Sequence, residues 1–180
     1  MEKIDLSILI CSLLERRKTF LDNLLSILEP QLEGKNVELL IMTDNRKRTI
    51  PEKRNHAISG AQGKYFCFVD DDDRVADDYV DSILAEIPKD TDVIVFDALI
   101  TFNNGISKNV KYGMEYDHCE KSDAYYRRPN PLMVHKRSTV TEKFINVSNE
   151  DDEWAKRRLP SITSQSRIDK ILYYYDARYC

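Results

Sequence analysis

The first half of the chain alternates short continuous apolar runs with longer segments of helical periodicity. The apolar runs cover residues 6–13, 37–42 and 65–69, and each has the length and bulk of a buried strand. Helices are expected between and after these runs, at residues 15–28, 49–63 and 77–87. Pro30 and Pro88 are expected to end the first and the third helix. This βαβαβα order predicts a parallel sheet with right-handed connections.

The second half of the chain has a less regular pattern. Two strands are expected at residues 92–102 and 106–112, joined by a hairpin-like turn. Residues 115–131 are polar and aromatic with weak periodicity, which indicates a mobile loop. The remaining expected elements are a short strand at 132–135, a helical turn within 138–144, a helix that Asn149 caps and Pro160 ends, and closing strands at 162–164 and 171–175. The pattern therefore predicts a small antiparallel extension of the parallel sheet.

An acidic run, Asp70–Asp73, follows directly from the third apolar run. Four like charges at one strand end repel each other unless the end is open to water or a cation gathers them. In open α/β sheets, ligands bind at the carboxyl ends of the strands. The run is therefore a candidate divalent-metal site that faces an anionic ligand. The plainer alternative is a solvated loop or helix start, whereas an EF-hand is excluded because Val75 stands where that loop requires glycine.

The carboxyl ends of the three expected strands carry the next candidate residues. These residues are Ser12 and Leu13 on the first strand, Asp44 after the second, and the acidic run after the third. In a parallel sheet these ends point the same way, so they can line one pocket. Arg54 and Asn55, on the helix before the third strand, are expected to face that pocket. The combination suits a nucleoside diphosphate, because Mg²⁺ and Mn²⁺ prefer carboxylate oxygens and substrate phosphates.

A second acidic cluster, Glu150–Glu153, lies about eighty residues downstream of the first. It is either a charged helix start, where carboxylates offset the helix dipole, or the source of a general base beside the metal pocket. Trp154, the only tryptophan, is either a core residue or a platform for the acceptor. Both alternatives remain open from the residues alone.

The composition is that of a soluble globular protein. The chain has 180 residues, of which 42% are hydrophobic and 32% charged, and its net charge of -4 gives no basic field for nucleic acid. We expect one domain, residues 1–180, with a nucleotide-binding half at about 1–90 and an acceptor half at about 91–180. No apolar run reaches membrane-spanning length. The four cysteines have no close pairing, so we expect a reducing, cytoplasmic setting, or the host cytoplasm if the chain is viral.

Several segments together resemble the inverting glycosyltransferases of family 2, which have the GT-A fold. The matching segments are residues 6–10 before a leucine-rich helix, residues 37–45, Lys53-Arg54-Asn55 within 53–58, Gly63 to Asp73, and the pair Glu150-Asp151. They span residues 5–155 in the order and spacing of that family. The resemblance implies an α/β fold, in which a three-layer α/β/α sandwich encloses a mainly parallel central sheet with a small antiparallel extension.

The resemblance also implies a role for each candidate residue. Ser12, Leu13, Asp44, Arg54, Asn55, Asp70 and Asp71 would bind the nucleotide sugar, with Asp44 on a base that is usually uracil and the first aspartates of the run on the ribose. Asp72, with Asp70, would hold Mn²⁺ or Mg²⁺. Asp151 would be the catalytic base, and Glu150 would orient it or touch the acceptor. A single displacement by an acceptor hydroxyl would then invert the anomeric centre of the donor sugar.

The chain departs from the family pattern at a few positions. Thr43 replaces an acidic residue that is common before the Asp44 position, and Cys11 replaces a usual proline. No histidine follows the expected base, so Asp176 is the alternative third metal ligand. The short chain fits a compact soluble member, and a phage-encoded one is a candidate. The expected donor is UDP-linked, and the expected acceptor is a glycan or a hydroxymethylated base in phage DNA.

Three other functions compete with this interpretation. A haloacid-dehalogenase-like phosphatase would use Asp71 as nucleophile and Asp73 as acid, but its motif normally follows the first strand rather than the third. A nucleotidyltransferase normally has a glycine-rich first loop, and residues 11–17 contain no glycine. A nucleotide-binding module without catalytic activity is the third alternative.

Overall fold

The computed structural model describes residues 3–177. Its strands are β1 (Leu6–Leu13), β2 (Val37–Asp44), β3 (Tyr65–Phe68), β4 (Arg74–Val75), β5 (Val93–Thr101), β6 (Ser107–Tyr112), β7 (Cys119–Glu120), β8 (Ala124–Arg127), β9 (Val134–Lys136) and β10 (Gln165–Asp176). Its α-helices are α1 (Asp22–Leu32), α2 (Ile50–Gly60), α3 (Tyr79–Glu86) and α4 (Glu150–Arg158). The described strands form one mixed sheet in the order β2-β1-β3-β9-β5-β6-β8-β7, with β10 paired to β5 and β4.

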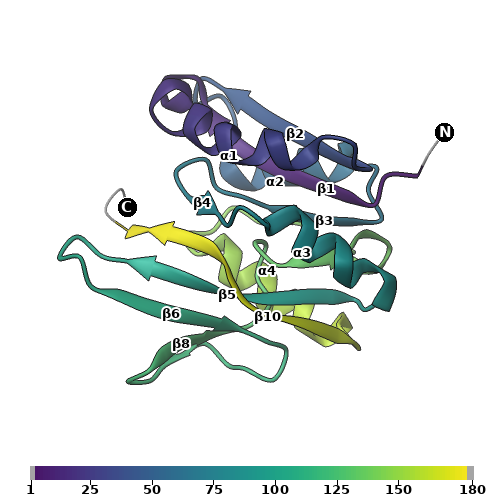
Figure 1. Ribbon diagram of the computed structural model, residues 1–180, viewed down its shortest axis with the longest axis vertical. Helices are drawn as coiled ribbons and strands as arrows, with labels where there is room; N and C mark the ends of the chain where they lie inside the picture. Colours follow the sequence, from purple (N-terminus) through teal and green to yellow (C-terminus); the bar gives the residue numbers. More distant parts are fainter. Residues whose placement is uncertain (1–2, 178–180) are drawn as a thin grey trace.

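The parallel part of the sheet is β2-β1-β3. Every residue of β1 pairs with a residue of β2, from Leu6 with Val37 to Leu13 with Asp44. Because side chains alternate across a strand, β1 contributes to two separate cores. Leu6, Ile8 and Ile10 pack in the larger core with α1 and α3, whereas Leu9 packs with α2 and α4 in the smaller one. The helices thus cover both faces, and Figure 1 shows α3 in front of the sheet and α4 behind it.

The remaining strands extend this sheet with antiparallel pairs. β9 runs antiparallel to both β3 and β5, and β6 runs antiparallel to β5. The long strand β10 runs parallel to β5, and two register irregularities let it cross toward β4. This course is visible in Figure 1, where β10 passes over β5 and ends beside β4. The end of β10 therefore lies next to the acidic run that precedes β4.

The structure confirms the predicted strands and helices of the first half of the chain. Helix α2 begins with a capping box, in which Thr49 accepts from the N–H of Glu52 and the Glu52 side chain accepts from Thr49. The prediction that Pro30 ends the first helix was wrong, because α1 continues to Leu32 with Pro30 in its last turn. The segment before α1 is also irregular, with a 3₁₀-helix at Leu14–Arg16 and a π-helix at Arg17–Leu21.

Predictions for the second half were less accurate. The expected loop at 115–131 contains β7 and β8, which pair with each other, while β8 also adds to β6. The closing strand expected at 171–175 is confirmed as part of the longer strand β10, whereas residues 162–164, expected as a strand, lie just before it and form none. Asn149 precedes α4, but its side chain makes no capping hydrogen bond. Within residues 3–177, no helix combines the length and apolar character that crossing a bilayer would require.

Candidate active site

The carboxyl end of β1 joins the ends of the two neighbouring strands. The buried Ser12 hydroxyl donates to Asp71 Oδ2 at 2.6 Å, and the Ser12 carbonyl accepts from Lys53 Nζ at 2.9 Å. Leu13 is half-buried and lies opposite Asp44 in the register with β2. The structure therefore brings the predicted strand ends together, although the Ser12 hydroxyl is already engaged by a carboxylate of the protein.

Asp44 is held in place by a buried lysine. Lys53 Nζ lies 3.2 Å from Asp44 Oδ1, and the backbone N–H of Arg48 donates to Oδ2 at 2.8 Å. Loss of hydration would by itself raise the pKa of Asp44, but the hydrogen bonds from Lys53 and Arg48 outweigh it and lower the pKa. Asp44 is thus an ionised acceptor at the end of β2, where the predicted contact with the nucleotide base would be made.

Arg16 neutralises the middle of the acidic run. Its Nη2 lies 3.1 Å from Asp71 Oδ1 and 2.5 Å from Asp72 Oδ2, and its guanidinium stacks over the Phe20 ring. Burial raises the pKa of Asp71, against the opposing effects of Ser12 and Arg16. Asp71 is buried, whereas Asp72 keeps a partly exposed side chain. Of these two carboxylates, Asp72 is therefore the one that a ligand from solvent can reach.

Asp73 connects the acidic run to β10. The Tyr173 hydroxyl donates to Asp73 Oδ2 at 2.7 Å, and the backbone N–H of Asp176 donates to Oδ1 at 3.1 Å. Burial and then the charge of Asp70 raise the pKa of Asp73 to about 8, although both hydrogen bonds oppose this rise. The backbone N–H of Asp70 donates to the same Tyr173 oxygen at 3.1 Å. Asp73 therefore fixes the turn against β10.

Arg54 joins the acidic run to α4. Its Nη2 lies 3.4 Å from Asp70 Oδ1, and its Nη1 lies 3.3 Å from Glu150 Oε1 and forms a further ion pair with Asp151. The guanidinium lies over two aromatic rings, with 5.4 Å to the Phe68 centroid and 5.3 Å to that of Phe144. Sequence reasoning expected Arg54 on the nucleotide side of the pocket. The structure instead places this buried cation between carboxylates from the two halves of the chain.

Asn55 does not reach the pocket. Its side-chain amide donates to the Phe144 carbonyl at 2.9 Å and accepts from the Phe144 N–H at 2.8 Å. Phe144 in turn stacks on the buried Trp154, with ring centroids 5.1 Å apart. The expected nucleotide contact from Asn55 is thus replaced by a contact that anchors the loop before α4, and Trp154 is a core residue.

Two cavities adjoin the acidic run. The first has a volume of about 410 Å³ and is lined by both Asp70 and Asp151, whose side chains are 34% and 37% exposed. The second, of about 350 Å³, is lined by Asp71, Asp72 and Asp73 and also by Asp176. The predicted base therefore shares a cavity with the first residue of the acidic run, whereas Asp72 opens on the neighbouring one.

The carboxylates fit a divalent cation only in a substrate-assisted arrangement. Among residues 3–177, no three His, Cys, Asp or Glu side chains are grouped so that they could hold a metal ion by themselves. Mg²⁺ and Mn²⁺ are commonly held by one or two carboxylates together with substrate phosphates and water. Asp72 meets this requirement, because its carboxylate is reachable and already attracts a cation, the Arg16 guanidinium.

Sequence reasoning missed three residues that organise this site: Arg16, Lys53 and Tyr173. Arg16 follows β1 by three positions. The predicted parallel sheet already put this basic residue at the same edge as the acidic run, so its pairing with Asp72 could have been expected. Lys53 precedes Arg54 on α2, where consecutive residues face different strand ends. Tyr173 carries no such signal, because its position depends on the register of β10.

Comparison with known proteins agrees with this architecture. The crystal structure of residues 1–349 of S. aureus TarS is similar to the structure of this chain, with a TM-score of 0.64 and 15% sequence identity. The similarity covers 96% of this chain and 60% of that fragment. The same fragment in complex with UDP-GlcNAc gives a TM-score of 0.63 at 16% identity, over 97% and 59% of the two chains. A197 from STIV gives 0.54 at 11% identity, over 96% of this chain and 82% of that one. These likenesses confirm the predicted GT-A-like α/β fold.

The sequence comparisons identify the family. This chain spans about 60% of the length of the TarS fragment. No curated protein sequence matches the chain. The sequence profile of glycosyl transferase family 2 matches residues 21–140, which is more than half of the chain. The protein belongs to glycosyl transferase family 2.

Proposed function

We propose that this protein transfers a sugar from a UDP-linked donor to an acceptor hydroxyl, with inversion at the anomeric carbon. The observation that carries the proposal is the Arg54 bridge, which holds Asp70 and Asp151 at one cavity. Family membership supports the reaction class. The choice of UDP is supported by TarS, whose fragment is described in complex with UDP and with UDP-GlcNAc.

Asp151 is the residue we assign as general base. Its carboxylate reaches the cavity and takes the proton of the acceptor hydroxyl as that oxygen attacks the anomeric carbon. Arg54 fixes the orientation of this carboxylate through the ion pair. When Asp151 becomes neutral by accepting the proton, Arg54 still has Asp70 and Glu150 as anionic partners. Glu150 thereby keeps the buried cation paired through the reaction.

The donor side is assigned to the strand ends. Asp44 accepts a hydrogen bond from the nucleotide base, and Asp70 lies where the donor meets the cavity. Asp72, helped by Asp70, is assigned to Mn²⁺ or Mg²⁺, which when bound neutralises charge on the leaving diphosphate. Arg16 must release Asp72 for this, and its guanidinium is then free to face the diphosphate.

A thermal-shift screen of nucleotide sugars, with and without Mn²⁺, tests this proposal. One UDP-sugar at about 100 times its Kd should stabilise the protein by about 2.7 kcal/mol, which raises Tm by roughly 5–10 °C for a chain of this size. Slow hydrolysis of the bound donor, with water as the acceptor, should release UDP and the free sugar, which mass spectrometry of the same mixtures detects. If no nucleotide sugar shifts Tm under either condition, the assignment of a donor site is wrong.

A further inference from the structure

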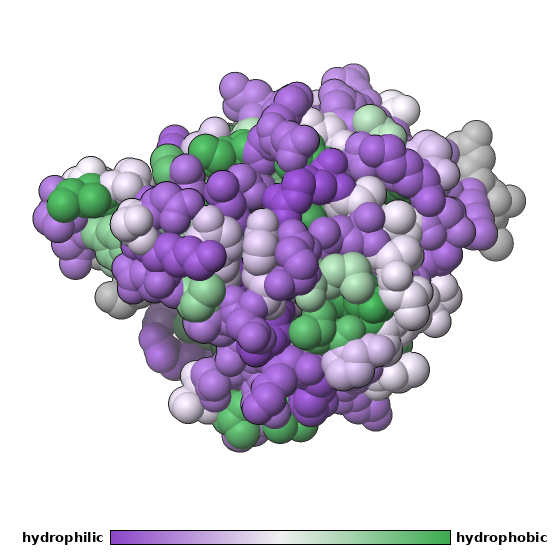
Figure 2. Space-filling model, turned by 90° about the horizontal axis from the view of Figure 1, so that it is seen from below, coloured by the Kyte–Doolittle hydropathy of each residue, from purple (hydrophilic) through white to green (hydrophobic). Residues whose placement is uncertain are grey.

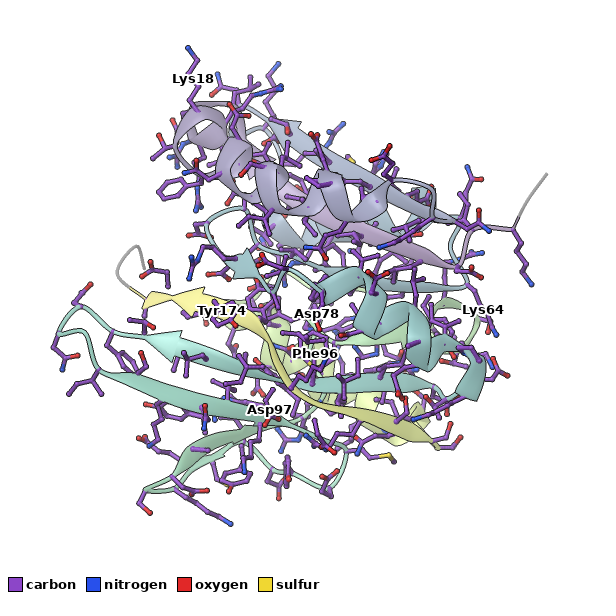
Figure 3. All side chains as sticks on the ribbon, in the orientation of Figure 1. Lys18, Lys64, Asp78, Phe96, Asp97 and Tyr174 are labelled. Atoms are coloured by element: carbon purple, nitrogen blue, oxygen red, sulfur yellow. The ribbon has the colours of Figure 1, made fainter. Side chains whose placement is uncertain are left out.

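Strand β2 forms one edge of the sheet, and within residues 3–177 it pairs with β1 alone. Figure 1 shows it at the top of the molecule, at the opposite margin from β8. None of its eight residues is buried, and Ile41 is 36% exposed. Phe96, labelled in Figure 3 on the interior strand β5, is by contrast fully buried. The outer side of β2 therefore presents backbone N–H and C=O groups to which a further strand can pair, beside partly exposed aliphatic side chains.

This edge lacks the features that keep exposed strands from pairing. Short length, lysine, proline and β-bulges are the usual protections. β2 contains no lysine or proline, and its register with β1 has no bulge along all eight residues. Its two carboxylates are held inside the protein, because Ser7 donates to Glu38 at 2.6 Å and Lys53 lies 3.2 Å from Asp44. The central residues 39–42 are thus apolar and unprotected.

The opposite end of the strand order is protected. β7 has only two residues, Cys119 and Glu120, and Lys108 Nζ lies 2.7 Å from Glu120 Oε1. The face seen from below in Figure 2 is mostly hydrophilic with small apolar patches, so it offers no broad apolar docking surface. Of these two edges, β2 is therefore the one to which another strand can add.

The charges at the two ends of β2 indicate which strand can add. Glu29 and Glu33 are exposed in the last turn of α1 and just after it, before β2 begins. Lys47 and Arg48 are exposed just after β2 ends, so the strand has an acidic start and a basic end. Antiparallel pairing with a second copy brings these unlike ends together twice, whereas parallel pairing would bring like ends together. Two further charged side chains near these ends are paired within the protein, Lys35 with Asp81 and Arg46 with Glu15.

We propose that two copies of this chain form a dimer by antiparallel pairing of their β2 strands about a twofold axis. Residues that face each other in such a pair lie on the same side of the sheet, so pairing can be centred on a residue but not between two residues. Centring it on Leu40 sets Leu40 against itself and Leu39 against Ile41 of the second copy. Glu33 then lies near Lys47 of the second copy. The two sheets continue as one, with apolar pairs in the middle and opposite charges at both ends.

Analytical ultracentrifugation of the full chain tests for this dimer. The expected species has twice the chain mass of 21.1 kDa, with a Kd of about 1–100 μM for an edge contact of this kind. Ile41→Lys puts a charge from each copy into the middle of the pairing and should raise the Kd by about 100-fold or more. Ile106→Lys, at a more exposed isoleucine between β5 and β6, is the matched control and should dimerise as the wild type does.

A charge exchange tests the orientation of the two strands. Lys47→Glu should raise the Kd about tenfold, because it puts a like charge beside Glu33 of the other copy at both ends of the pairing. Glu33→Lys should have a similar effect, and the double variant should recover the wild-type Kd. Both residues are exposed, so these variants replace Ile41→Lys if that variant loses its circular dichroism spectrum.

Hydrogen exchange locates the contact within the chain. The amides of residues 39–42 should exchange more slowly at protein concentrations above the Kd than below it, whereas those of β7 should not change. A monomer at about 500 μM, above the whole expected range of Kd, would overturn the inference. So would a dimer that Ile41→Lys leaves intact, a double charge variant that does not recover affinity, or exchange at residues 39–42 that is independent of concentration.

Discussion

The two sides of the candidate active site differ in how their polar groups are satisfied. On the side of β1, β2 and β3, the carboxylates of Asp44 and Asp71 are paired with Lys53 and Arg16 inside the protein. On the side of β5, β6, β8 and β10, a cavity of about 410 Å³ stands open beside Asp151. In the proposed function, a donor would therefore displace internal ion pairs such as that of Arg16 with Asp72, whereas an acceptor would enter a cavity that is already open. Arg54 is the contact between the two sides.

The largest expected effect comes from removing the base on the acceptor side. Asp151→Asn should lower sugar transfer by about 10²- to 10⁴-fold, because an amide cannot take the proton from the attacking hydroxyl. UDP-sugar affinity should stay within about threefold of the wild type, a change of well under 1.4 kcal/mol. Steady-state transfer assays and calorimetric titration measure the two quantities. Asp152→Asn is the matched control, because Asp152 pairs with His118 and Arg128 instead of Arg54. Equal losses in both variants would contradict the assignment.

Arg54→Met breaks the contact between the two sides. It leaves Asp70, Glu150 and Asp151 without their shared cation, and because these carboxylates are partly exposed, the free energy of unfolding should fall by about 2–3 kcal/mol. Urea denaturation measures this change. Arg46→Met is the control, because Arg46 is exposed and its ion pair with Glu15 contributes about 1 kcal/mol or less. A loss no larger than that of the control would show that the two sides are held together by packing alone.

His135 lies on β9, the strand that joins the two sides, and its protonation provides a test of that junction. It packs between Phe66 of β3 and Trp154 of α4, and burial lowers its pKa to about 3. Below pH 6.5 the His135 side chain binds a proton in the unfolded chain but not in the folded protein, so stability is lost as the pH falls from 6.5 toward 3. At pH 5 the loss relative to pH 7.5 should be about 2 kcal/mol.

Urea unfolding at several pH values measures the His135 effect. His135→Gln, whose amide can still donate to the Asn130 carbonyl, should have a flatter pH profile between 7.5 and 5. His56→Gln, at an exposed histidine on α2, should keep the wild-type slope. Parallel profiles for the wild type and His135→Gln would mean that His135 is protonated in the folded protein.

The smallest expected effect concerns Arg16 on the donor side. Arg16→Gln removes the cation that competes for Asp72, so Mn²⁺ should bind about three- to fivefold more tightly, a change of roughly 1 kcal/mol. Electron paramagnetic resonance of free Mn²⁺ measures this without catalysis. Arg17→Gln, which affects only an exposed pair with Asp22, should leave Mn²⁺ binding unchanged. Weaker Mn²⁺ binding in Arg16→Gln would show that Arg16 supports the metal site.

The difference between the two sides of the site also explains which of its residues could be predicted from the sequence. On the donor side, each strand is a continuous apolar run that ends in the residues of the site, so Asp44 and Asp70–Asp73 were found from local pattern. Their partners Lys53 and Arg16 depend on where a long side chain reaches, which local pattern does not encode. Asn55 looked like a ligand contact by position, but it bonds to a backbone 89 residues away.

Predicting the side of β5, β6, β8 and β10 required information that local sequence patterns do not carry. Its cavity takes alternate residues from four strands, and their alignment depends on the irregular register of β10 with β5. β7 and β8 are too short to give a periodic signal, so residues 115–131 were expected to be a loop. Asp151 was predicted through the family resemblance, and its ion pair with Arg54 became visible only in the folded chain.

The most direct test of the account is a crystal structure of Asp151→Asn with Mn²⁺ and the UDP-sugar selected by thermal shift. We expect the uracil at Asp44, the diphosphate and Mn²⁺ at Asp72 with Arg16 moved aside, and the anomeric carbon facing the cavity between Asp70 and position 151. A donor sugar seated away from that cavity, with the Arg16 pairing to Asp71 and Asp72 intact, would contradict it.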